Sequence, residues 1–481
     1  MKNKLIILTM FTVALVSCRK ELLSPIPQTA ISDAVAFATP ERVAQQVLGM
    51  YSEVKTGDFY AGRYLIYNDV RGEDFLNRTL NFVTAYETWN FNVVSSSREV
   101  RGFWGAAYSA INGCNVVLDG LETAPIAAAL KEQYRGEARF LRALSYYSLL
   151  TLYARPYWDG NGAKDGVPLR LKAETTGENR NLARSSVAAI YTQILKDLDF
   201  AETNLPLTYS TAYNRTTRAQ RNTAIALKTR VYLSMRQYDK VITEADKIVS
   251  ATPPFVATSG VANRLEPTIA GVFAAPYTSA ENILSFAYSA LDLPGGQASL
   301  NSYYNPPPNG LGDYYLNPSG IVSDAGWKST DARRVFNQVS VGLTFLRKWP
   351  KNGGIDPDYV NSIRYAEILL NLAEATVRQN NTVDARAVAL LNAVRQRSDA
   401  STTFTVAGFA TPQSLLDQIA IERRIELLGE GFRSIDRLRL GQALPAKGTV
   451  QSIAPADAHY IWPIPLSELL VNKAMTQNPG H

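Results

Sequence analysis

Cysteine and histidine are scarce in this chain of 481 residues. The only cysteines are Cys18 and Cys114, and the only histidines are His459 and His481. With so few thiols and imidazoles, a disulfide framework, haem ligation and most zinc sites are excluded, and we expect neither a metal nor a cofactor. Cys114 lies in a helix-like stretch, where a free thiol usually serves as a small buried hydrophobe.

Clusters of positive charge are also missing. Lys and Arg number 49 against 43 Asp and Glu, which gives a formal net charge of +6, but no run of five or more basic residues occurs. A protein that binds nucleic acid is expected to concentrate its positive charge on one surface. The composition therefore predicts no nucleic-acid partner.

Catalytic motifs are absent as well. No Gly-x-Ser-x-Gly elbow accompanies His459, and no glycine-rich phosphate-binding loop occurs. The carboxylate pairs Glu73-Asp74 and 356–358 would serve a glycosidase only if another carboxylate faced them across a cleft. We therefore predict that the protein is not an enzyme and has no catalytic residues.

The first residues are typical of a secretory signal. Lys2 and Lys4 precede an apolar run from Leu5 to Leu15, which at about 1.5 Å per residue is too short to cross a bilayer core of about 30 Å. No later segment has 18 consecutive apolar residues. The run therefore predicts a cleaved signal peptide and not a membrane-spanning helix.

The end of the apolar run predicts a lipid anchor. The segment Leu15-Val16-Ser17-Cys18 resembles the lipobox of bacterial lipoproteins, in which the cysteine is acylated and becomes the first residue. We predict that residues 1–17 are the signal peptide, that Cys18 carries the lipid, and that the proline-containing residues 18–36 form an extended tether.

Helical periodicity dominates the rest of the chain, for which we predict a single mainly α-helical domain over residues 37–481. Thr39-Pro40 predicts a helix start, with the helix running to about Val54. Further helices are predicted over 132–153, 187–203, 219–235, 238–250, 363–379, 383–397 and 413–429. The pairs at 219–250 and 363–397 are typical of tetratricopeptide-like helix pairs, although no strict period recurs.

One long stretch has a different composition. Residues 253–358 are rich in Pro, Gly, Asn, Ser and Tyr and show few helical signals. More than a hundred irregular residues inside a folded chain usually form a functional, loop-built region. We therefore predict a loop-rich insert that carries a ligand-binding region.

Two aromatic stretches are candidates for binding a sugar, because sugar rings pack their C–H faces on aromatic rings while amides and guanidinium groups bond the hydroxyls. The first stretch contains Tyr86, Trp89 and Phe91, near Asn77, Arg78 and Asn81. The second lies in the insert and contains Tyr303, Tyr304, Tyr314, Tyr315 and Trp327. Because the insert has little amphipathic structure with which to bury five large rings, we expect some of them to be exposed.

A charged segment near the C-terminus favours a structural role. In the segment 422–433, Glu426 and Glu430 are spaced to pair with Arg423 and Arg433 on a helix and its C-terminal turn. We expect these ion pairs to fix the end of a helix.

Several blocks of the chain resemble one family over essentially its whole length. They are Trp104-x-x-x-Tyr108, the segment 139–149 with Gly166-Val167-Pro168-Leu169, the segments 226–233, 364–375 and 391–397, Glu422-Arg423-Arg424-x-Glu426, and Trp462-Pro463-Ile464-Pro465. Together they resemble the SusD/RagB nutrient-uptake lipoproteins of Bacteroidetes outer membranes. The resemblance implies tetratricopeptide-like helix pairs that support a loop-rich binding face, and it implies no catalysis.

The resemblance also implies partners and a location. Such proteins are anchored by lipid to the outer membrane at the cell surface, where they form a lid over a TonB-dependent, SusC-like barrel transporter and deliver an oligosaccharide or another oligomeric nutrient to it. A peptide-binding member of the same uptake system stays open as a second interpretation. A secreted glycosidase and a helical-repeat scaffold that binds only proteins stay open as well.

Overall fold

The structure, a computed structural model, describes residues 35–178, 180–351 and 357–481. The predicted signal peptide over 1–17 and the predicted lipidation site Cys18 lie outside the described residues, as does most of the predicted tether over 18–36. None of the helices in the described ranges is long and apolar enough to cross a membrane.

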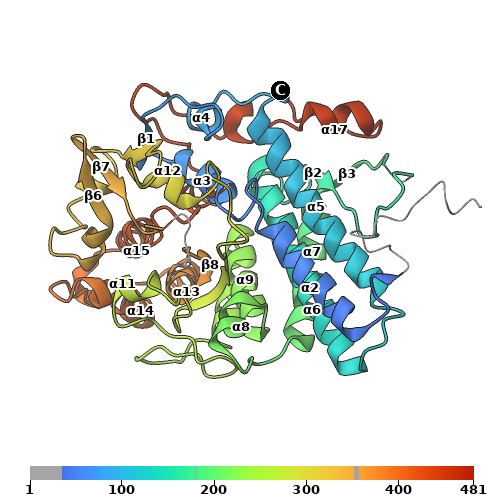
Figure 1. The fold of residues 1–481 in the computed structure, drawn as a ribbon. Coiled ribbons are helices and arrows are strands. Elements are labelled where there is room, and N and C mark those ends of the chain that lie inside the picture. The colour runs from blue at the N-terminus through green and yellow to red at the C-terminus, as the bar shows by residue number, and fades with distance from the viewer. Residues whose placement is uncertain (1–34, 179, 352–356) are drawn as a thin grey trace, which may run out of the picture.

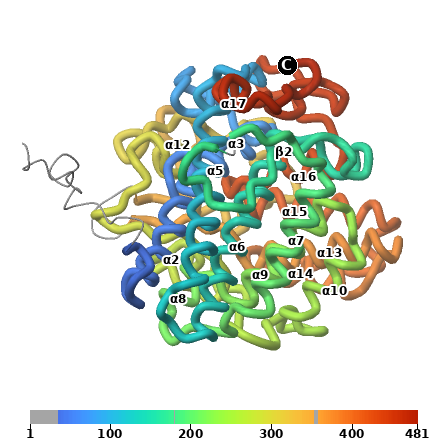
Figure 2. The backbone as a smooth tube through the Cα atoms, turned by 90° about the vertical axis from the view of Figure 1, so that its right-hand side faces the viewer, coloured from blue at the N-terminus to red at the C-terminus, as the bar shows by residue number. Residues whose placement is uncertain are grey.

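Helices α2, α5, α6 and α7 form one side of the molecule, and the predicted mainly α-helical fold is confirmed (Figure 1). Figure 2 shows this side, on which α2 contacts α5, α5 contacts α6 and α6 contacts α7. Two further pairs, α9 with α10 and α13 with α14, pack in the same way. The bounds of these helices and of α15 are α2 (Pro40–Val54), α5 (Arg98–Gly120), α6 (Ala128–Tyr153), α7 (Val187–Asn204), α9 (Arg221–Ser234), α10 (Tyr238–Ala245), α13 (Tyr365–Asn380), α14 (Ala385–Ser398) and α15 (Pro412–Glu426).

Helix α2 shows how the sequence specifies these elements. The Thr39 side chain accepts a hydrogen bond from the backbone N–H of Arg42 at 3.4 Å, and Pro40 occupies the first helical position. The helix ends at Val54, as predicted. Its buried stripe, which includes Val43, Val47 and Met50, packs against α5 and α6, so burial of one apolar face holds the helix in place.

Helices α13, α14 and α15, together with shorter helices and strand pairs, make up the other side of the molecule (Figure 1). The short helices are α3 (Arg63–Val70), α4 (Tyr86–Trp89), α8 (Ala212–Thr217), α11 (Ile269–Val272), α12 (Leu300–Tyr304), α16 (Arg433–Arg439) and α17 (Leu466–Val471). Each strand has one antiparallel partner. The pairs are β1 (Phe75–Asn77) with β5 (Tyr314–Leu316), β2 (Asp165–Pro168) with β3 (Arg184–Ser186), β4 (Asn282–Phe286) with β8 (Val360–Arg364), and β6 (Asn337–Ser340) with β7 (Leu343–Leu346).

A buried ion network joins the loop-rich stretch to α14 and α15. The Glu426 carboxylate contacts the guanidinium groups of Arg333 and Arg364, each at 3.0 Å, and that of Arg397. The Glu430 carboxylate contacts Lys348 and Arg364, each at 2.7 Å. Since Arg333 and Lys348 belong to the loop-rich stretch, these contacts fasten that stretch to the helices.

The partners expected for the segment 422–433 were wrong. Arg423 pairs with Asp436 at 2.7 Å, and Arg433 pairs with Glu73. The physical reason is that α15 ends at Glu426, earlier than predicted, and the chain then turns at Gly429 with φ +84°. Side chains beyond that turn leave the helical spacing on which the expectation rested. Asp436 in α16 and the distant Glu73 take the place of the expected partners.

Candidate functional site

Strand pairing brings the two predicted aromatic stretches together. In the antiparallel register of β1 and β5, Asn77 lies opposite Tyr314 and Leu76 lies opposite Tyr315. The Tyr315 ring is partly exposed, and its centroid lies 6.4 Å from that of Phe345 in β7. Residues that are more than 230 positions apart in the sequence therefore contribute to one surface.

Arg78 and two asparagines fix the loop that leaves β1. The Nε and Nη2 atoms of Arg78 donate to the carbonyls of Gly312 and Leu311 at 2.7 and 2.6 Å. The Oδ1 atom of Asn77 accepts from the N–H of Leu80 at 2.8 Å. The Oδ1 atom of Asn81 likewise accepts from the N–H of Val83 at 3.0 Å, so the polar side chains hold the loop closed on itself.

An aromatic row leads from this loop into the core. Phe82 is 59% exposed, and its ring meets the ring of the half-buried Tyr86 edge-on with 5.3 Å between centroids. Tyr86 in turn stacks on the buried Trp89 at 6.1 Å. The Nε1 atom of Trp89 donates to the Phe75 carbonyl at 3.0 Å, which fixes the indole against β1. The outer rings are therefore supported from beneath.

We name this region the β1–α4 surface. It consists of Asn77, Arg78, Leu80, Asn81, Phe82, Tyr86, Leu311 and Tyr315, and α4 marks its place at the top of Figure 1. Leu80 and Leu311 are 60% and 37% exposed. An exposed group of apolar and aromatic side chains beside amide and guanidinium groups is typical of a binding surface.

Backbone strain is concentrated on the same segment. Leu80, Ala85 and Phe91 have positive φ values of 55°, 69° and 57°. Residues other than glycine rarely adopt this backbone conformation, because their Cβ atom crowds the backbone. Such strain tends to persist at functional sites. The strain is an observation independent of the aromatic side chains, and it points to the same surface.

The exposure expected for the insert was wrong for four of its five rings. Tyr303, Tyr304 and Tyr314 are at most 1% exposed, and Trp327 is 3% exposed. The expectation considered only what the insert itself could bury. In the structure Tyr304 stacks on Phe75 with 4.7 Å between centroids, so a ring from the insert is covered by a segment that is distant in the sequence.

Hydrogen bonds confirm that these tyrosines belong to the core. The Tyr304 hydroxyl donates to Asp69 Oδ2 at 3.3 Å, and the Tyr314 hydroxyl donates to the Thr84 carbonyl at 2.8 Å. Trp327 lies away from both, against the Arg334 guanidinium, 4.0 Å from the ring centroid. Trp89 and Phe91 are each 7% exposed, so they support the surface and do not present their faces to solvent.

Two ionisable groups lie beneath the surface. Burial raises the pKa of Glu99 to about 8, although Thr88 donates to Glu99 Oε2 through its backbone N–H, at 3.1 Å, and through its hydroxyl. Burial also lowers the pKa of Lys447 well below its usual value, and the Lys447 ammonium nitrogen lies 3.8 Å from the Phe91 ring centroid. Burial thus drives both groups toward their uncharged forms.

Replacing Glu99 by Gln is expected to flatten the dependence of stability on pH. Because the folded-state pKa of Glu99 lies above its usual 4.5, this carboxyl stabilises the fold at low pH and loses that contribution as the pH rises through about 8. Glu99→Gln keeps an acceptor for Thr88 and cannot ionise. The melting temperature should therefore fall less in this variant than in the wild type between about pH 6 and about pH 9. Equal falls in both proteins, with Glu122→Gln as the exposed control, would contradict this.

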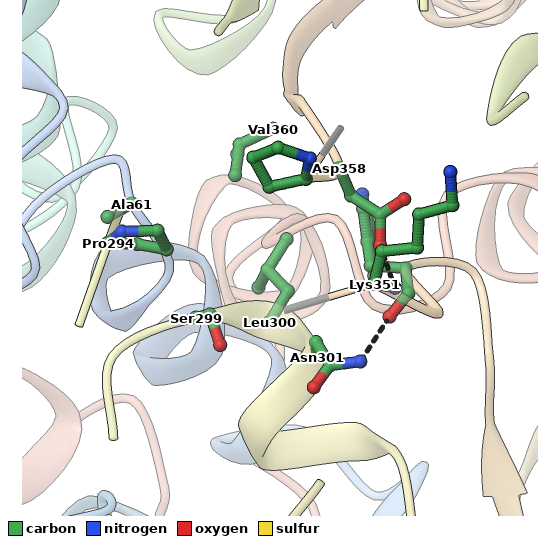
Figure 3. Close-up of a pocket in the computed structure, with 10 residues that line it drawn as sticks. Ala61, Pro294, Ser299, Leu300, Asn301, Lys351, Asp358 and Val360 are labelled. Carbon is green, nitrogen blue, oxygen red and sulfur yellow. Dashed lines mark hydrogen bonds between the residues drawn. The ribbon is translucent and has the colours of Figure 1, made fainter. Parts of the chain in front are cut away.

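Figure 3 shows a pocket at the edge of α12. It is lined by Ala61, Pro294, Leu300, Asn301 and other residues, and the Asn301 Nδ2 atom donates to the Trp349 carbonyl at 3.1 Å. Its volume of about 20 Å³ has room for about one water molecule. This pocket cannot hold a sugar ring, so it is not our candidate site.

Sequence reasoning missed three exposed side chains of the β1–α4 surface, Leu311 and the neighbouring pair Leu80 and Phe82. The pair lies in a short loop between Asn77 and Tyr86 that also contains Arg78, Thr79, Asn81 and Thr84. Large apolar side chains in such a loop have few neighbours of their own segment to pack on. That isolation was the signal that could have identified them.

Comparison with solved structures places the fold among known proteins. A SusD superfamily protein from Bacteroides fragilis is 34% identical to this chain, with 92% of this chain and 99% of that one covered and a TM-score of 0.82. The chain belongs to the SusD/RagB family. Two family models agree: one described as "Starch-binding associating with outer membrane" matches residues 24–233, and one described as "SusD family" matches residues 322–481.

More distant SusD relatives match the chain over most of its length. SusD-like protein P38 from Formosa agariphila is 22% identical, with 94% of this chain and 93% of that protein covered. A solved structure named a laminarin-binding SusD-like protein is 22% identical, covers 92% of this chain and 100% of its own, and has a TM-score of 0.72. The SusD family is one of carbohydrate-binding proteins.

Proposed function

We propose that this protein captures a glycan on its β1–α4 surface and delivers it to a TonB-dependent, SusC-like outer-membrane transporter. The observation that carries the proposal is the row of Phe82, Tyr86 and Trp89 beside the amides of Asn77 and Asn81. Two of its rings are accessible and fixed from beneath, as stacking on a sugar face requires.

The polar groups of the surface complement the rings. Arg78 and the two asparagines use only part of their hydrogen-bonding capacity within the loop, since a guanidinium has five N–H donors and an amide has two donors and an acceptor. The Nδ2 atom of Asn77 is buried, so Arg78 and Asn81 are the residues that would bond sugar hydroxyls. A ligand chain lying along β1 would contact rings and amides together.

The proposed location follows from the sequence and the family. Acylation at Cys18 would tether the protein to the outer membrane, in agreement with the outer-membrane association in one family description. A lipid anchor provides no route across the bilayer, because only helices and closed barrels span membranes. Delivery of the ligand therefore needs a barrel partner.

Removing the outer rings is expected to weaken glycan binding. Each stacked ring contributes on the order of 1 kcal/mol, so Phe82→Ala and Tyr86→Ala should each reduce affinity several-fold, and the double variant should reduce it more. Affinity would be measured by calorimetry against laminarin and soluble starch oligosaccharides. Leu470→Ala in α17 is the matched control, because Leu470 is 62% exposed and Phe82 is 59% exposed.

Two outcomes would count against this site. If the double variant binds a glycan as tightly as the wild type while its circular dichroism is unchanged, the ligand lies elsewhere. If Leu470→Ala weakens binding equally, the effect is not specific to the aromatic row.

A further inference from the structure

A second cleft lies far from the β1–α4 surface. It is formed by α8, by the loop around residues 260–264 and by the turn before β4, and its volume is about 370 Å³. Helix α8 lies near the bottom of the molecule in both views, whereas α4 lies near the top of Figure 1. The side chains that matter here are those of Arg215, Thr216, Arg264, Thr278 and Ser279.

The charge of this cleft is of one sign. Its lining contains Arg215 and Arg264 but neither aspartate nor glutamate. The Nη1 atom of Arg215 donates only to backbone carbonyls, those of Tyr209 at 3.0 Å and Ser210 at 3.2 Å. Within the ranges that the structure describes, neither guanidinium forms an ion pair with a carboxylate.

A neighbouring arginine shows the contrast. Arg218, one turn of chain further along, pairs with the buried carboxylate of Glu137 at 2.7 Å and is a structural residue. Arg264, by comparison, is exposed and donates through Nη1 to the Ala262 carbonyl at 3.4 Å. The hydrogen bonds of Arg215 and Arg264 within the described residues thus go to backbone carbonyls and not to carboxylates.

Hydroxyl groups complete the lining. Thr216 is 3% exposed, and the buried Ser279 hydroxyl has no hydrogen-bond partner among the described residues. A buried hydroxyl without a partner is unfavourable unless a bound group or water satisfies it. Guanidinium groups with adjacent hydroxyls are the donors that bind carboxylates, sulfates and phosphates.

We propose that this cleft binds an oxyanion group carried by the glycan, either a sulfate ester or the carboxylate of a uronic acid. The inference rests on the proposed glycan-binding function and extends it from neutral to acidic polymers. The rings of the β1–α4 surface would bind sugar faces, and the two arginines would select for charged substituents.

Inorganic sulfate, free glucuronate and a neutral monosaccharide such as glucose are the probes, because they test the cleft without a known polymer. Sulfate or glucuronate should raise the melting temperature of the wild type more than glucose or an equal ionic strength of chloride does. The double variant Arg215→Gln, Arg264→Gln should weaken the binding of the favoured anion about tenfold or more. Arg101→Gln, which removes an exposed arginine on α5, is the control and should bind as the wild type does.

The outcomes separate cleanly. Preference for sulfate identifies a sulfate ester, and preference for glucuronate identifies a uronic acid. If the double variant binds both anions as the wild type does, or if Arg101→Gln loses as much affinity, the anion site is wrong. Because these probes do not depend on Phe82 or Tyr86, their failure would leave the proposed glycan function standing. Failure of the Phe82 and Tyr86 variants would leave anion binding in this cleft standing but would remove the reason to assign the anion to a glycan.

Discussion

Replacing Glu426 by alanine is expected to destabilise the fold by about 3–5 kcal/mol. Its carboxylate is fully buried and contacts Arg333, Arg364 and Arg397. Although burial opposes ionisation, Arg397, Arg364 and Arg333 hold the pKa of Glu426 well below its usual range. Removing this carboxylate would leave the positive charge of the buried guanidinium groups only partly neutralised. An unneutralised buried charge costs more free energy than the loss of the contacts themselves.

Urea unfolding followed by circular dichroism would measure the change, and an exposed ion pair provides the control. Glu122 is 70% exposed in its side chain and pairs with Arg135 at 2.7 Å. Glu122→Ala should cost no more than about 1 kcal/mol, because exposed ion pairs contribute little. Similar small losses in both variants would show that the buried network does not stabilise the fold.

Replacing Cys18 by alanine is expected to move most of the protein from the membrane to the soluble fraction, or to leave it as an unprocessed precursor. The prediction follows from the lipobox-like segment 15–18, which would lose its acylation site. Lipid chains provide the anchoring energy of such proteins, so their loss removes the attachment. Fractionation and the mass of the mature protein would measure the effect.

Membranes from wild-type cells would test the proposed partnership with a barrel transporter. From wild-type cells, mild detergent extraction and affinity capture should yield a large barrel protein together with this chain. An unchanged mass and normal fractionation of Cys18→Ala would contradict lipidation. Repeated recovery of the wild-type protein alone would contradict the partnership with a barrel.

Local sequence signals were sufficient to predict most of the long helices, although α5 was recognised only as a helix-like stretch around Cys114. Thr39 and Pro40 specify the start of α2 through a hydrogen bond and a fixed φ, both of which act within one turn. The buried stripe of α2 repeats at helical spacing, so its burial follows from the pattern alone. The end of α15 was predicted too late, because Gly429 and Gly431 adopt positive φ values that end helical geometry.

The candidate site depended on contacts that the sequence does not display. Tyr86 and Asn77 were identified because their own segment suggested sugar binding, and the structure places them on one surface. Tyr303 and Tyr304 were misjudged because their cover comes from α3 and β1, more than 200 positions earlier. Local composition reports which residues a segment contains, but exposure is decided by which distant segment packs on them.

The hydrogen bonds around Asn77, Arg78 and Asn81 affect the conformational entropy that is lost when a ligand binds. The loop already has its bonded shape without a ligand, and the Trp89 indole is already fixed against β1. Little ordering of the protein is then needed on association, so the loss of conformational entropy falls on the ligand. A stiff oligomer should therefore bind this surface more tightly than a flexible one of equal contact area, since less of its freedom remains to be lost.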